Sequence, residues 1–576
     1  MASESHAGFL ISSFLRGNNV STIFTLCGGH VSPILVGCEE EGIDIVQVRD
    51  EASAVFAADA TSRITNTIGV AVVTAGPGVT NTMTAIKNAQ LAQSPLLLIG
   101  GAAATLLKGK GSLQDIDQLK LMKPHVKSAV SVKKVRDIIP TLHNAINCAF
   151  SDVPGPVFVE LPIDLLYPEE IIKKEFASQL SSKSFFDRIF KSYVEYYLKD
   201  MFAIKKSYMR LHKKKIRHAS QSSIDKASIT IYQSKKPVVL LGNQVIHNKE
   251  YLERFVKALN KLSIPTYTSG MARGCLGKDD PFFFRHNRKH ALKNADLVIT
   301  VGVPLDFRLG YGFSINKDAK IIALNKSKED LTKNRKPDLK LQGDPCISIY
   351  EIAKVINNKV SCDSWLQELQ TMEQERDNEI LSQAETHTDF VNPVKVCTTI
   401  NNVLDKDSII IADGGDFVGT ASYILRPPHP LSWLDPGPFG TLGVGGGFAL
   451  GAKSAFPDKE VWIIYGDGAS AFSLAEFDTF VRHKLPVIAV VGNDASWQQI
   501  AREQVDMLGS DVGTNLNDTN YHQVAEGYGA KGFLVTETSQ LHDVLLQAKS
   551  DAKMGIPVLI NVRIGKTDFR KGSISV

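Results

Sequence analysis

Short apolar runs alternate with amphipathic stretches along most of the chain. In the first part of the chain, apolar runs occupy residues 23–26, 70–74, 96–99 and 157–161, with stretches of helical periodicity between them. Buried strands that alternate with helices are typical of a parallel sheet. We therefore predict an N-terminal α/β domain over residues 1–170.

Two further regions repeat this alternation. Apolar runs at 238–241, 297–301 and 320–324 predict a central α/β domain over residues 231–362, and residues 392–576 predict a third domain. The predicted fold class is α/β, with three Rossmann-like, doubly wound parallel sheets.

The segments between the predicted domains have a different character. Residues 363–391 are charged and form a predicted helical linker, whereas residues 171–230 form a basic, aromatic insertion. Basic residues beside aromatic amphipathic stretches are typical of contact with an anionic membrane surface. Peripheral membrane contact through 185–217 is one interpretation, and packing of the aromatic side chains onto their own domain is the one that we favour.

Length and composition fit three globular domains. The 576 residues are 43% apolar and 22% charged, and the formal net charge of +4 gives no reason to invoke nucleic acid. Seven cysteines occur without CxxC spacing, which argues against a zinc site and for a reducing compartment. No apolar run approaches the ~20 residues of a membrane-spanning helix, and residues 1–16 lack the pattern of a signal peptide.

A glycine turn in the third domain predicts a phosphate site. The apolar run 462–465 leads into this turn, and residues 474–483 predict a helix after it. Backbone N–H groups near the start of a helix favour anions, so the turn suits a diphosphate. The predicted cofactor-binding residues of this turn are Gly466, Asp467, Gly468 and Ala469.

A second loop, about one βα unit later, predicts a metal site beside that turn. The apolar run 486–491 leads to Asn493, Asp494 and Ser496, which returns oxygen ligands to the same sheet edge. Together with Asp467, these groups suit a hard cation such as Mg²⁺. An ordinary Rossmann turn with two loop acids is the alternative.

Glu51 is the candidate catalytic carboxylate. It lies between a predicted strand at 43–48 and a predicted Ala-rich helix at 52–62, at the sheet edge where α/β proteins bind ligands. The alternative is an acidic residue favoured in the first turn of a helix by the helix dipole.

Glu51, the glycine turn and the Asn-Asp loop together resemble the thiamine diphosphate-dependent enzyme superfamily of the acetolactate synthase and benzaldehyde lyase type. The chain departs from that pattern with Asn493-Asp494 where Asn-Asn is usual. Matching residues 485–487 places Asp494 on the usual metal ligand, so we favour Asp494 over Asn493, with the Ser496 carbonyl beside it. The resemblance implies thiamine diphosphate and Mg²⁺ as cofactors. It also implies that Glu51 hydrogen-bonds the cofactor pyrimidine and makes the cofactor's amino group a base.

The same resemblance assigns further cofactor contacts. The Gly440 carbonyl corresponds to the acceptor for the cofactor amine, and Leu442 to the apolar side chain that holds the cofactor bent. An acid at 416 would repel phosphate, so we expect the Asp416 side chain to point away. The remaining matched positions are Thr74, Gly76 and Asn81 on the pyrimidine side and Gly415 on the diphosphate side.

Two loops of the first domain resemble the substrate loops of benzaldehyde lyase. His30 follows Gly28-Gly29, and Gln114 lies in the segment 111–118. By this resemblance Gln114 hydrogen-bonds a substrate hydroxyl, and a near-neutral imidazole at His30 accepts its proton. A helix-capping or packed imidazole is the alternative for His30.

The central domain carries two arginines after glycine-rich turns. Arg273 and Arg308 are suited to pairing with phosphate. Relatives place FAD, ADP or the CoA adenine moiety in this domain, and the sequence does not select among them. Structural ion pairs, for instance with Asp306, are the alternative.

Over nearly all of its length the chain resembles the acetolactate synthase-like 2-hydroxyacyl-CoA lyases of animals. That resemblance implies cleavage of a long-chain 2-hydroxyacyl-CoA into formyl-CoA and an aldehyde one carbon shorter, as in fatty acid α-oxidation. It further implies a homodimer or homotetramer in which Glu51 of one subunit faces the diphosphate domain of another. These relatives have an N-terminal anchor at the endoplasmic reticulum. We expect the cytosolic side of that membrane by resemblance, with a cytosolic protein as the alternative because the sequence shows no such anchor.

Three other functions stay open. An acetolactate synthase-type ligase that decarboxylates a 2-oxo acid would use every cofactor residue named above. An inactive, cofactor-binding regulatory subunit is the second alternative. A plain nucleotide-binding α/β module is the third, and it does not explain Glu51 together with the Gly440 loop.

Overall fold

The computed structural model describes residues 6–178, 196, 201 and 216–571. The chain folds into two compact units, Met1–Lys214 and Lys215–Val576. Nearly all of the segment 185–217, for which membrane contact was one interpretation, lies outside the described residues.

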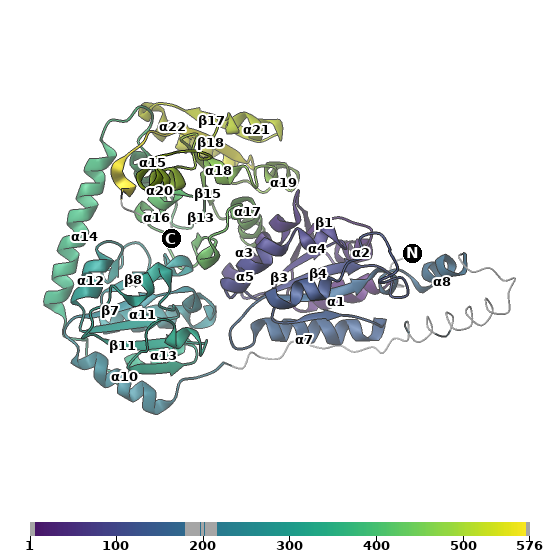
Figure 1. The fold of residues 1–576 in the computed structure, drawn as a ribbon, viewed down its shortest axis with the longest axis horizontal. Helices are drawn as coiled ribbons and strands as arrows, with labels where there is room; N and C mark the ends of the chain where they lie inside the picture. Colours follow the sequence, from purple (N-terminus) through teal and green to yellow (C-terminus); the bar gives the residue numbers. More distant parts are fainter. Residues whose placement is uncertain (1–5, 179–195, 197–200, 202–215, 572–576) are drawn as a thin grey trace. The chain divides into compact units, whose positions relative to one another are not determined.

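The described part of the first unit contains one six-stranded parallel sheet in the order β2-β1-β3-β4-β6-β5 (Figure 1). Strands β3 and β4 are buried throughout, which explains their continuous apolar sequences. The strands are β1 Thr22–Leu26, β2 Asp44–Gln47, β3 Gly69–Val73, β4 Leu96–Ala102, β5 Ala129–Ser131 and β6 Val157–Pro162.

The helices of this unit place the candidate residues at the carboxyl ends of the strands. Helix α3 begins at Glu51 because the Asp50 side chain caps it, accepting a hydrogen bond from the Ala52 N–H at 2.7 Å. The helices are α1 Ala7–Gly17, α2 Ser32–Glu40, α3 Glu51–Ile64, α4 Pro77–Thr80, α5 Met83–Leu91, α6 Gln118–Met122, α7 Ile138–Phe150 and α8 Glu169–Ser178.

The second unit contains two six-stranded parallel sheets within its described residues, so the predicted fold class is confirmed. The central sheet has the order β12-β11-β10-β7-β8-β9, and the C-terminal sheet has the order β14-β13-β15-β16-β18-β17. The central strands are β7 Pro237–Leu241, β8 Thr266–Thr268, β9 Phe283–Phe284, β10 Leu297–Val301, β11 Lys320–Asn325 and β12 Leu339–Gln342. The C-terminal strands are β13 Ile409–Asp413, β14 Trp433–Leu434, β15 Val461–Gly466, β16 Ile488–Asn493, β17 Lys531–Val535 and β18 Val558–Arg563.

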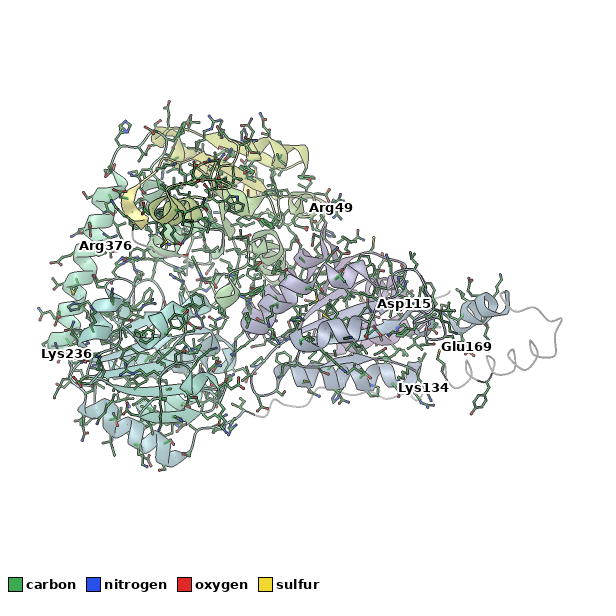
Figure 2. All side chains as sticks on the ribbon, viewed as in Figure 1. Arg49, Asp115, Lys134, Glu169, Lys236 and Arg376 are labelled. Atoms are coloured by element: carbon green, nitrogen blue, oxygen red, sulfur yellow. The ribbon has the colours of Figure 1, made fainter. Side chains whose placement is uncertain are left out.

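The long helix α14 occupies the predicted linker between these two sheets. The Trp365 indole N–H near its start donates to the Pro237 carbonyl at 3.2 Å. The ammonium of Lys236, which is labelled in Figure 2, lies 4.9 Å from the centre of the Trp365 ring. The linker is therefore packed structure. The helices of this unit are α10 Gln221–Gln233, α11 Leu252–Leu262, α12 Arg288–Asn294, α13 Pro345–Val355, α14 Asp363–Ala384, α15 Pro393–Val403, α16 Asp416–Ile424, α17 Val444–Ala455, α18 Asp467–Ser470, α19 Glu476–Arg482, α20 Gln498–Leu508, α21 Tyr521–Gly527 and α22 Thr538–Lys553.

One predicted helix differs from the structure. The stretch 474–483 predicted one helix after the glycine turn, but the chain forms α18 directly at the turn and α19 two residues later than predicted. The intervening turn is held by Ser473, whose hydroxyl accepts a hydrogen bond from the Gly446 N–H at 3.1 Å. A contact with the first turn of α17 therefore holds the turn that separates the two helices.

The topology of the C-terminal sheet brings its candidate residues to one edge. Strands β13, β15 and β16 are neighbours, and they end at Asp413, Gly466 and Asn493. The carboxyl ends of parallel strands form the usual binding edge of an α/β sheet. Among the described helices, none has the length and apolarity to cross a membrane.

Candidate active site

Glu51 is a buried carboxylate held by one specific partner. Only 7% of the residue is exposed, and its Oε2 accepts a hydrogen bond from the Asn81 amide at 3.0 Å. Gly78 lies beside the other carboxylate oxygen, since a Cβ at Gly78 would lie 3.5 Å from Glu51 Oε1. Asn81 follows α4, which starts at the Gly76 turn. The structure thus brings Glu51 and two of its predicted neighbours, Gly76 and Asn81, into one arrangement.

His30 and Thr74 lie side by side in the same unit. The His30 Nδ1 is 3.1 Å from the Thr74 hydroxyl, and burial of the half-buried ring lowers the pKa of His30 below its ordinary value of 6.5. A Cβ at Gly28 would lie 2.4 Å from Thr74 Cβ, so glycine is required for this close approach. The imidazole is therefore neutral near pH 7 and can accept a proton.

Gln114 and Gln118 have different roles in the structure. Gln114 is half-buried in a left-handed conformation with φ of 61°, and its backbone packs on the Gly76 turn. Gln118 is buried, and its side chain hydrogen-bonds the backbone of the same turn. Gln114 was a predicted site residue and Gln118 was not, because a glutamine in a polar stretch of sequence gives no sign of its burial.

Asp467 in the glycine turn is a buried carboxylate surrounded by backbone donors. Its Oδ1 accepts from the Gly468 N–H at 2.7 Å and its Oδ2 accepts from the Ser496 N–H at 3.1 Å. Burial raises the pKa of Asp467, and these N–H groups act in the opposite direction. Gly468 cannot carry a side chain without displacing Trp497, whose ring would lie 2.5 Å from its Cβ. The hydrogen bonds join the turn to the loop after β16.

The structure separates the roles of Asn493 and Asp494. The Asn493 amide is buried and donates to the Asp518 carboxylate at 3.2 Å and to the Thr519 carbonyl at 3.3 Å. Asp494 lies near Asp467, and burial together with the charge of Asp467 raises the pKa of Asp494 to about 7. Two carboxylates that repel each other in a buried loop fit a shared divalent cation. This geometry favours Asp494 over Asn493 as a cation ligand.

Asp416 carries a charge that is compensated locally. Its carboxylate pairs with the Arg502 guanidinium and lies 3.8 Å from Arg570 Nε. The preceding Gly414 adopts φ of 144°, and a Cβ there would lie 2.7 Å from the Gly466 nitrogen. The loop containing Gly415 therefore runs close to the glycine turn, as a diphosphate-side loop requires.

The loop with Gly440 and Leu442 is fixed by Asp413, for which no role was predicted. Asp413 is fully buried and accepts hydrogen bonds from the Gly443 N–H at 3.0 Å and the Gly445 N–H at 2.7 Å. Burial raises the pKa of Asp413 to about 7, against the effect of both N–H donors. Gly440 is exposed in a left-handed conformation and Leu442 is half-buried, so both remain accessible to a ligand.

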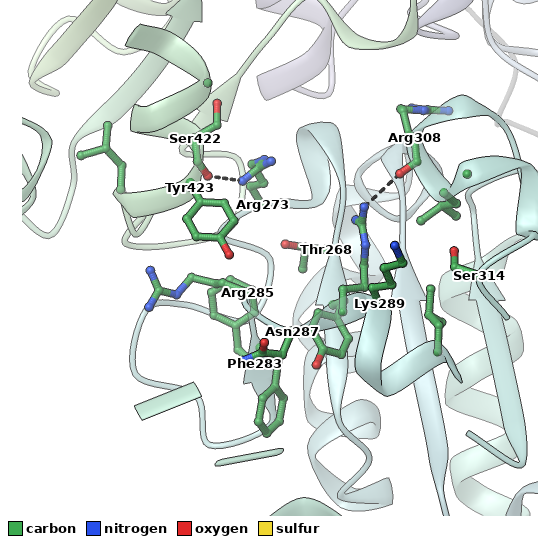
Figure 3. Close-up of a pocket in the computed structure, with 18 of the residues that line it drawn as sticks. Thr268, Arg273, Phe283, Arg285, Asn287, Lys289, Arg308, Ser314, Ser422 and Tyr423 are labelled. Carbon is green, nitrogen blue, oxygen red and sulfur yellow. Dashed lines mark hydrogen bonds between the residues drawn. The ribbon is translucent and has the colours of Figure 1, made fainter. Parts of the chain in front are cut away.

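Arg273 and Arg308 line a cavity of about 710 Å³ between the central and C-terminal sheets of the second unit (Figure 3). Arg273 donates to the Ser422 carbonyl at 2.5 Å, and its guanidinium lies 5.3 Å from the Trp433 ring centre. Arg308 forms a two-pronged ion pair with Asp306. The ion-pair alternative therefore applies to Arg308, although both side chains still border the cavity.

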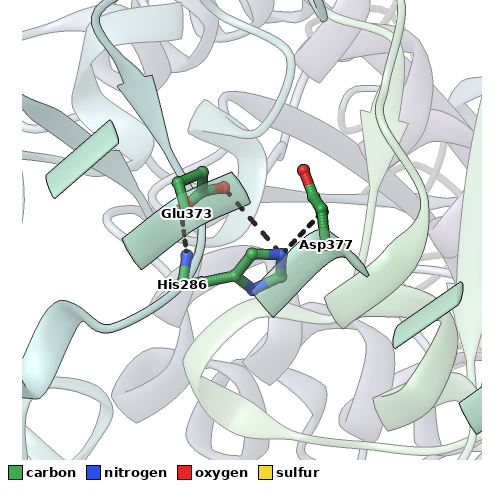
Figure 4. Close-up of side chains that lie close together, drawn as sticks. All are labelled: His286, Glu373 and Asp377. Carbon is green, nitrogen blue, oxygen red and sulfur yellow. Dashed lines mark hydrogen bonds and ion pairs between the residues drawn. The ribbon is translucent and has the colours of Figure 1, made fainter. Parts of the chain in front are cut away.

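His286, Glu373 and Asp377 form a cluster where α14 packs against the central domain (Figure 4). The His286 ring is 3.1 Å from Asp377, and Glu373 accepts the His286 backbone N–H at 2.9 Å. Burial acts to raise the pKa of Asp377, but the His286 hydrogen bond and the charges of Arg285 and Arg426 hold it well below its usual range. Two arginines already neutralise the acids, so this cluster is an ion-pair network that joins α14 to both sheets.

All seven cysteines lie among the described residues and are free thiols. Five of them are buried and Cys148 is half-buried, whereas Cys27 is exposed beside the His30 loop. This agrees with the absence of CxxC spacing in the sequence.

Models of three protein domains match the chain in order. They are the N-terminal TPP binding domain of thiamine pyrophosphate enzymes over residues 5–121, the central domain over 224–352 and the C-terminal TPP binding domain over 413–562. The first contains Glu51 and the third contains Asp467 and Asp494.

Whole-chain relatives agree with these matches. A protein of Danio rerio named 2-hydroxyacyl-CoA lyase 2 is 50% identical over 586 residues, which cover 100% of this chain and 94% of the relative. The Homo sapiens protein of the same name is 45% identical, with 100% and 92% covered. A probable acetolactate synthase of Mycobacterium bovis is 33% identical, with 97% and 96% covered.

Proposed function

The chain belongs to the thiamine pyrophosphate enzyme family, and from this premise we propose that it is a carbon–carbon lyase that cleaves 2-hydroxyacyl-CoA. The substrates are long-chain 2-hydroxy fatty acyl thioesters. The C1–C2 bond breaks, C2 leaves with the hydroxyl oxygen as an aldehyde, and C1 gains a proton and leaves as formyl-CoA. Thiamine diphosphate supplies a nucleophilic carbon at C2 of its thiazolium ring when it is bound.

The observation that carries the proposal is the buried carboxylate of Glu51, fixed by Asn81 at 3.0 Å. A carboxylate at this place would hydrogen-bond the cofactor pyrimidine and make the cofactor's amino group a base. Because only one oxygen of Glu51 is occupied by Asn81, the other remains available for the cofactor.

The proposed metal and diphosphate residues lie in the second unit. Asp467 and Asp494, with the Ser496 carbonyl, hold Mg²⁺, and the turn after β15 presents backbone N–H groups to the diphosphate. The Gly440 carbonyl would accept a hydrogen bond from the cofactor amine, and Leu442 would pack against the cofactor. The proximity of the Asp467 and Asp494 carboxylates, whose charges repel each other, supports this assignment.

The substrate side is formed by His30 and Gln114. His30 accepts the proton of the substrate hydroxyl as the C1–C2 bond breaks, and Gln114 hydrogen-bonds that hydroxyl. The lowered pKa of His30, caused by burial, supports its role as a base because the ring is unprotonated at neutral pH.

Mass spectrometry of reaction products tests this function. The full chain is incubated with a panel of 2-hydroxyacyl-CoA thioesters, with and without thiamine diphosphate and Mg²⁺. We expect formyl-CoA and an aldehyde shortened by one carbon, in equal amounts, only when both cofactors are present. Absence of both products across the panel would contradict the proposal.

Acetolactate synthesis is the second candidate, favoured by the 33% identity to a probable acetolactate synthase. The same protein is incubated with pyruvate, and acetoin is assayed after acid treatment. Acetoin formation without cleavage of any thioester would establish the ligase instead. Loss of both activities in a protein that still binds the cofactor would favour a regulatory subunit.

The arginine-lined cavity is proposed to hold the nucleotide part of FAD, ADP or CoA. Arg273 borders this cavity, and the hydroxyl of Tyr267 on the cavity wall is buried without a hydrogen-bond partner among the described residues. Absorbance at flavin wavelengths and mass spectrometry of released nucleotides distinguish these ligands.

We further propose a homodimer or homotetramer associated with the cytosolic side of the endoplasmic reticulum. Light scattering and fractionation test these two statements.

A further inference from the structure

We propose that Gln118 is a positioning residue that holds Glu51 and His30 in their working places. This inference rests on the proposed thiamine diphosphate function, and it assigns Gln118 no contact with cofactor or substrate. Gln118 is the first residue of α6 and only 1% exposed.

The Gln118 amide uses all of its hydrogen-bonding groups. Its Oε1 accepts from the Gly76 N–H at 2.9 Å, and its Nε2 donates to the Gly101 carbonyl at 3.0 Å and to Glu160 Oε2 at 2.9 Å. The orientation of the amide is determined, because a carboxylate and a carbonyl accept only, and a backbone N–H donates only. One buried side chain therefore ties together the loop after β3, the end of β4 and the end of β6.

The bond to Gly76 leads to Glu51. Gly76 has φ of 61° and begins the single turn of α4, and Asn81 caps the other end of that turn and binds Glu51. A Cβ at Gly76 would lie 2.7 Å from the Gln114 carbonyl, so this turn has little room to move in one direction. Loss of the hydrogen bond from the Gly76 N–H would let the turn move in the other direction. Asn81 would move with the turn.

The bond to Gly101 leads to His30. A Cβ at Gly101 would lie 2.5 Å from His30 Cβ, so the backbone of β4 forms the wall behind the imidazole. His30 in turn contacts Thr74 at 3.1 Å, two residues before Gly76. The Gln118 amide thus fixes both the turn that leads to Glu51 and the strand backbone beside His30.

Glu160 orients the amide from the opposite side. It is fully buried on β6, and Lys108, which is one-third exposed, neutralises its charge in an ion pair. The buried charge strengthens the hydrogen bond from Nε2 because a charged acceptor in a low-dielectric interior binds more tightly than a neutral one. This pair gives Gln118 a fixed anchor at the edge of the sheet.

The test compares Gln118→Met with a matched control in the full chain. Methionine keeps the length of the side chain and removes its three hydrogen bonds. Gln244→Met is the control, because Gln244 is also a buried amide, bonded to Asn325 and Lys326 in the central domain. Both variants lose a buried amide, so both are expected to lose thermal stability, and only the first is expected to disturb Glu51.

The first measurement is made on cofactor-free protein. Hydrogen–deuterium exchange of the peptide that covers 76–81 is expected to accelerate in Gln118→Met and to stay unchanged in Gln244→Met. The second measurement uses thiamine diphosphate and Mg²⁺ without substrate, and follows exchange of the thiazolium C2 proton by NMR. We expect that rate to fall about 100-fold in Gln118→Met, since displacement of a catalytic group by about 1 Å costs this much.

Gln118→Asn provides a second variant with a milder change. Its amide is too short to reach all three partners, so we expect an exchange rate between those of wild type and Gln118→Met. If both variants exchange the C2 proton within twofold of wild type at saturating cofactor, the inference is wrong. If the wild-type protein itself does not accelerate C2 exchange, the proposed function fails instead, and the two outcomes are distinct.

Discussion

Replacement of Glu51 by glutamine removes one ionisable group and leaves the shape of the site almost unchanged. In the structure the carboxylate accepts a single hydrogen bond, from the Asn81 amide at 3.0 Å. The amide oxygen of glutamine can accept the same bond. The variant therefore separates the chemistry of the carboxylate from its contribution to packing.

The expected magnitudes differ enough to decide between the two contributions. An altered hydrogen bond costs about 1 kcal/mol of unfolding free energy. Loss of a general acid–base group lowers a rate by about 10² to 10⁴, which corresponds to about 3–5 kcal/mol of activation free energy. We expect Glu51→Gln to fold with nearly wild-type stability and to lose at least about 100-fold in kcat.

The assay measures product formation from 2-hydroxyacyl-CoA and exchange of the thiazolium C2 proton in the same preparations. Asp50→Asn is the matched control, because Asp50 is exposed and only caps α3, and asparagine caps a helix equally well. Its kcat should match that of the wild type. A Glu51→Gln protein that kept more than a third of wild-type kcat would refute the assignment of Glu51.

Three further results are expected. Burial lowers the pKa of His30, so kcat/KM should stay level from pH 8 to 6.5 and fall at lower pH as the ring takes up a proton. This fall at low pH should be absent in His30→Gln. Stability should fall over the same range, since the unfolded chain binds that proton more tightly. Calorimetry should show that Asp494→Ala no longer binds Mg²⁺, whereas Asp494→Asn should keep its Mg²⁺ affinity within about tenfold of the wild type. Equal losses in the two variants would contradict the role of Asp494 as a ligand. Arg63→Ala leaves the buried Asp59 carboxylate unpaired, so thermal unfolding should show about 3–5 kcal/mol of lost stability, and a loss below about 1 kcal/mol would be inconsistent with the buried pair.

Strands and fold class could be predicted because parallel strands buried on both faces leave continuous apolar runs in the sequence. The run at 462–465 corresponds to β15 Val461–Gly466, which is buried up to its last residue. Glu51 and Asp467 could be predicted because each follows directly on a strand or begins a helix. Their places depend on local sequence.

Contacts between distant segments left no such local sign. Gln118 is 42 residues from both Gly76 and Glu160, and only the order of β3, β4 and β6 in the sheet brings the three together. Asp413 binds Gly443 and Gly445, 30 and 32 residues further along. Such a residue is buried because distant segments supply its hydrogen-bond partners. In the sequence it cannot be distinguished from an ordinary loop or strand-end residue.

The sequence alone does not decide whether Asn493 or Asp494 is the better candidate for the cation ligand. Contacts with other segments of the chain distinguish the two residues. Side chains on successive residues of a strand end point in different directions. Asn493 is turned to Asp518 and Thr519, and Asp494 is left to face the charge of Asp467. Where asparagine is usual, the cation would meet one carboxylate. With the cation proposed for this chain, Asp467 and Asp494 would both be ligands, and their mutual repulsion raises the free energy of the cation-free loop. The exchange of asparagine for aspartate therefore makes this loop more dependent on its cation. Both substitutions at 494 remove the repulsion, but only asparagine keeps a side-chain oxygen for the cation, which is why the two are expected to differ.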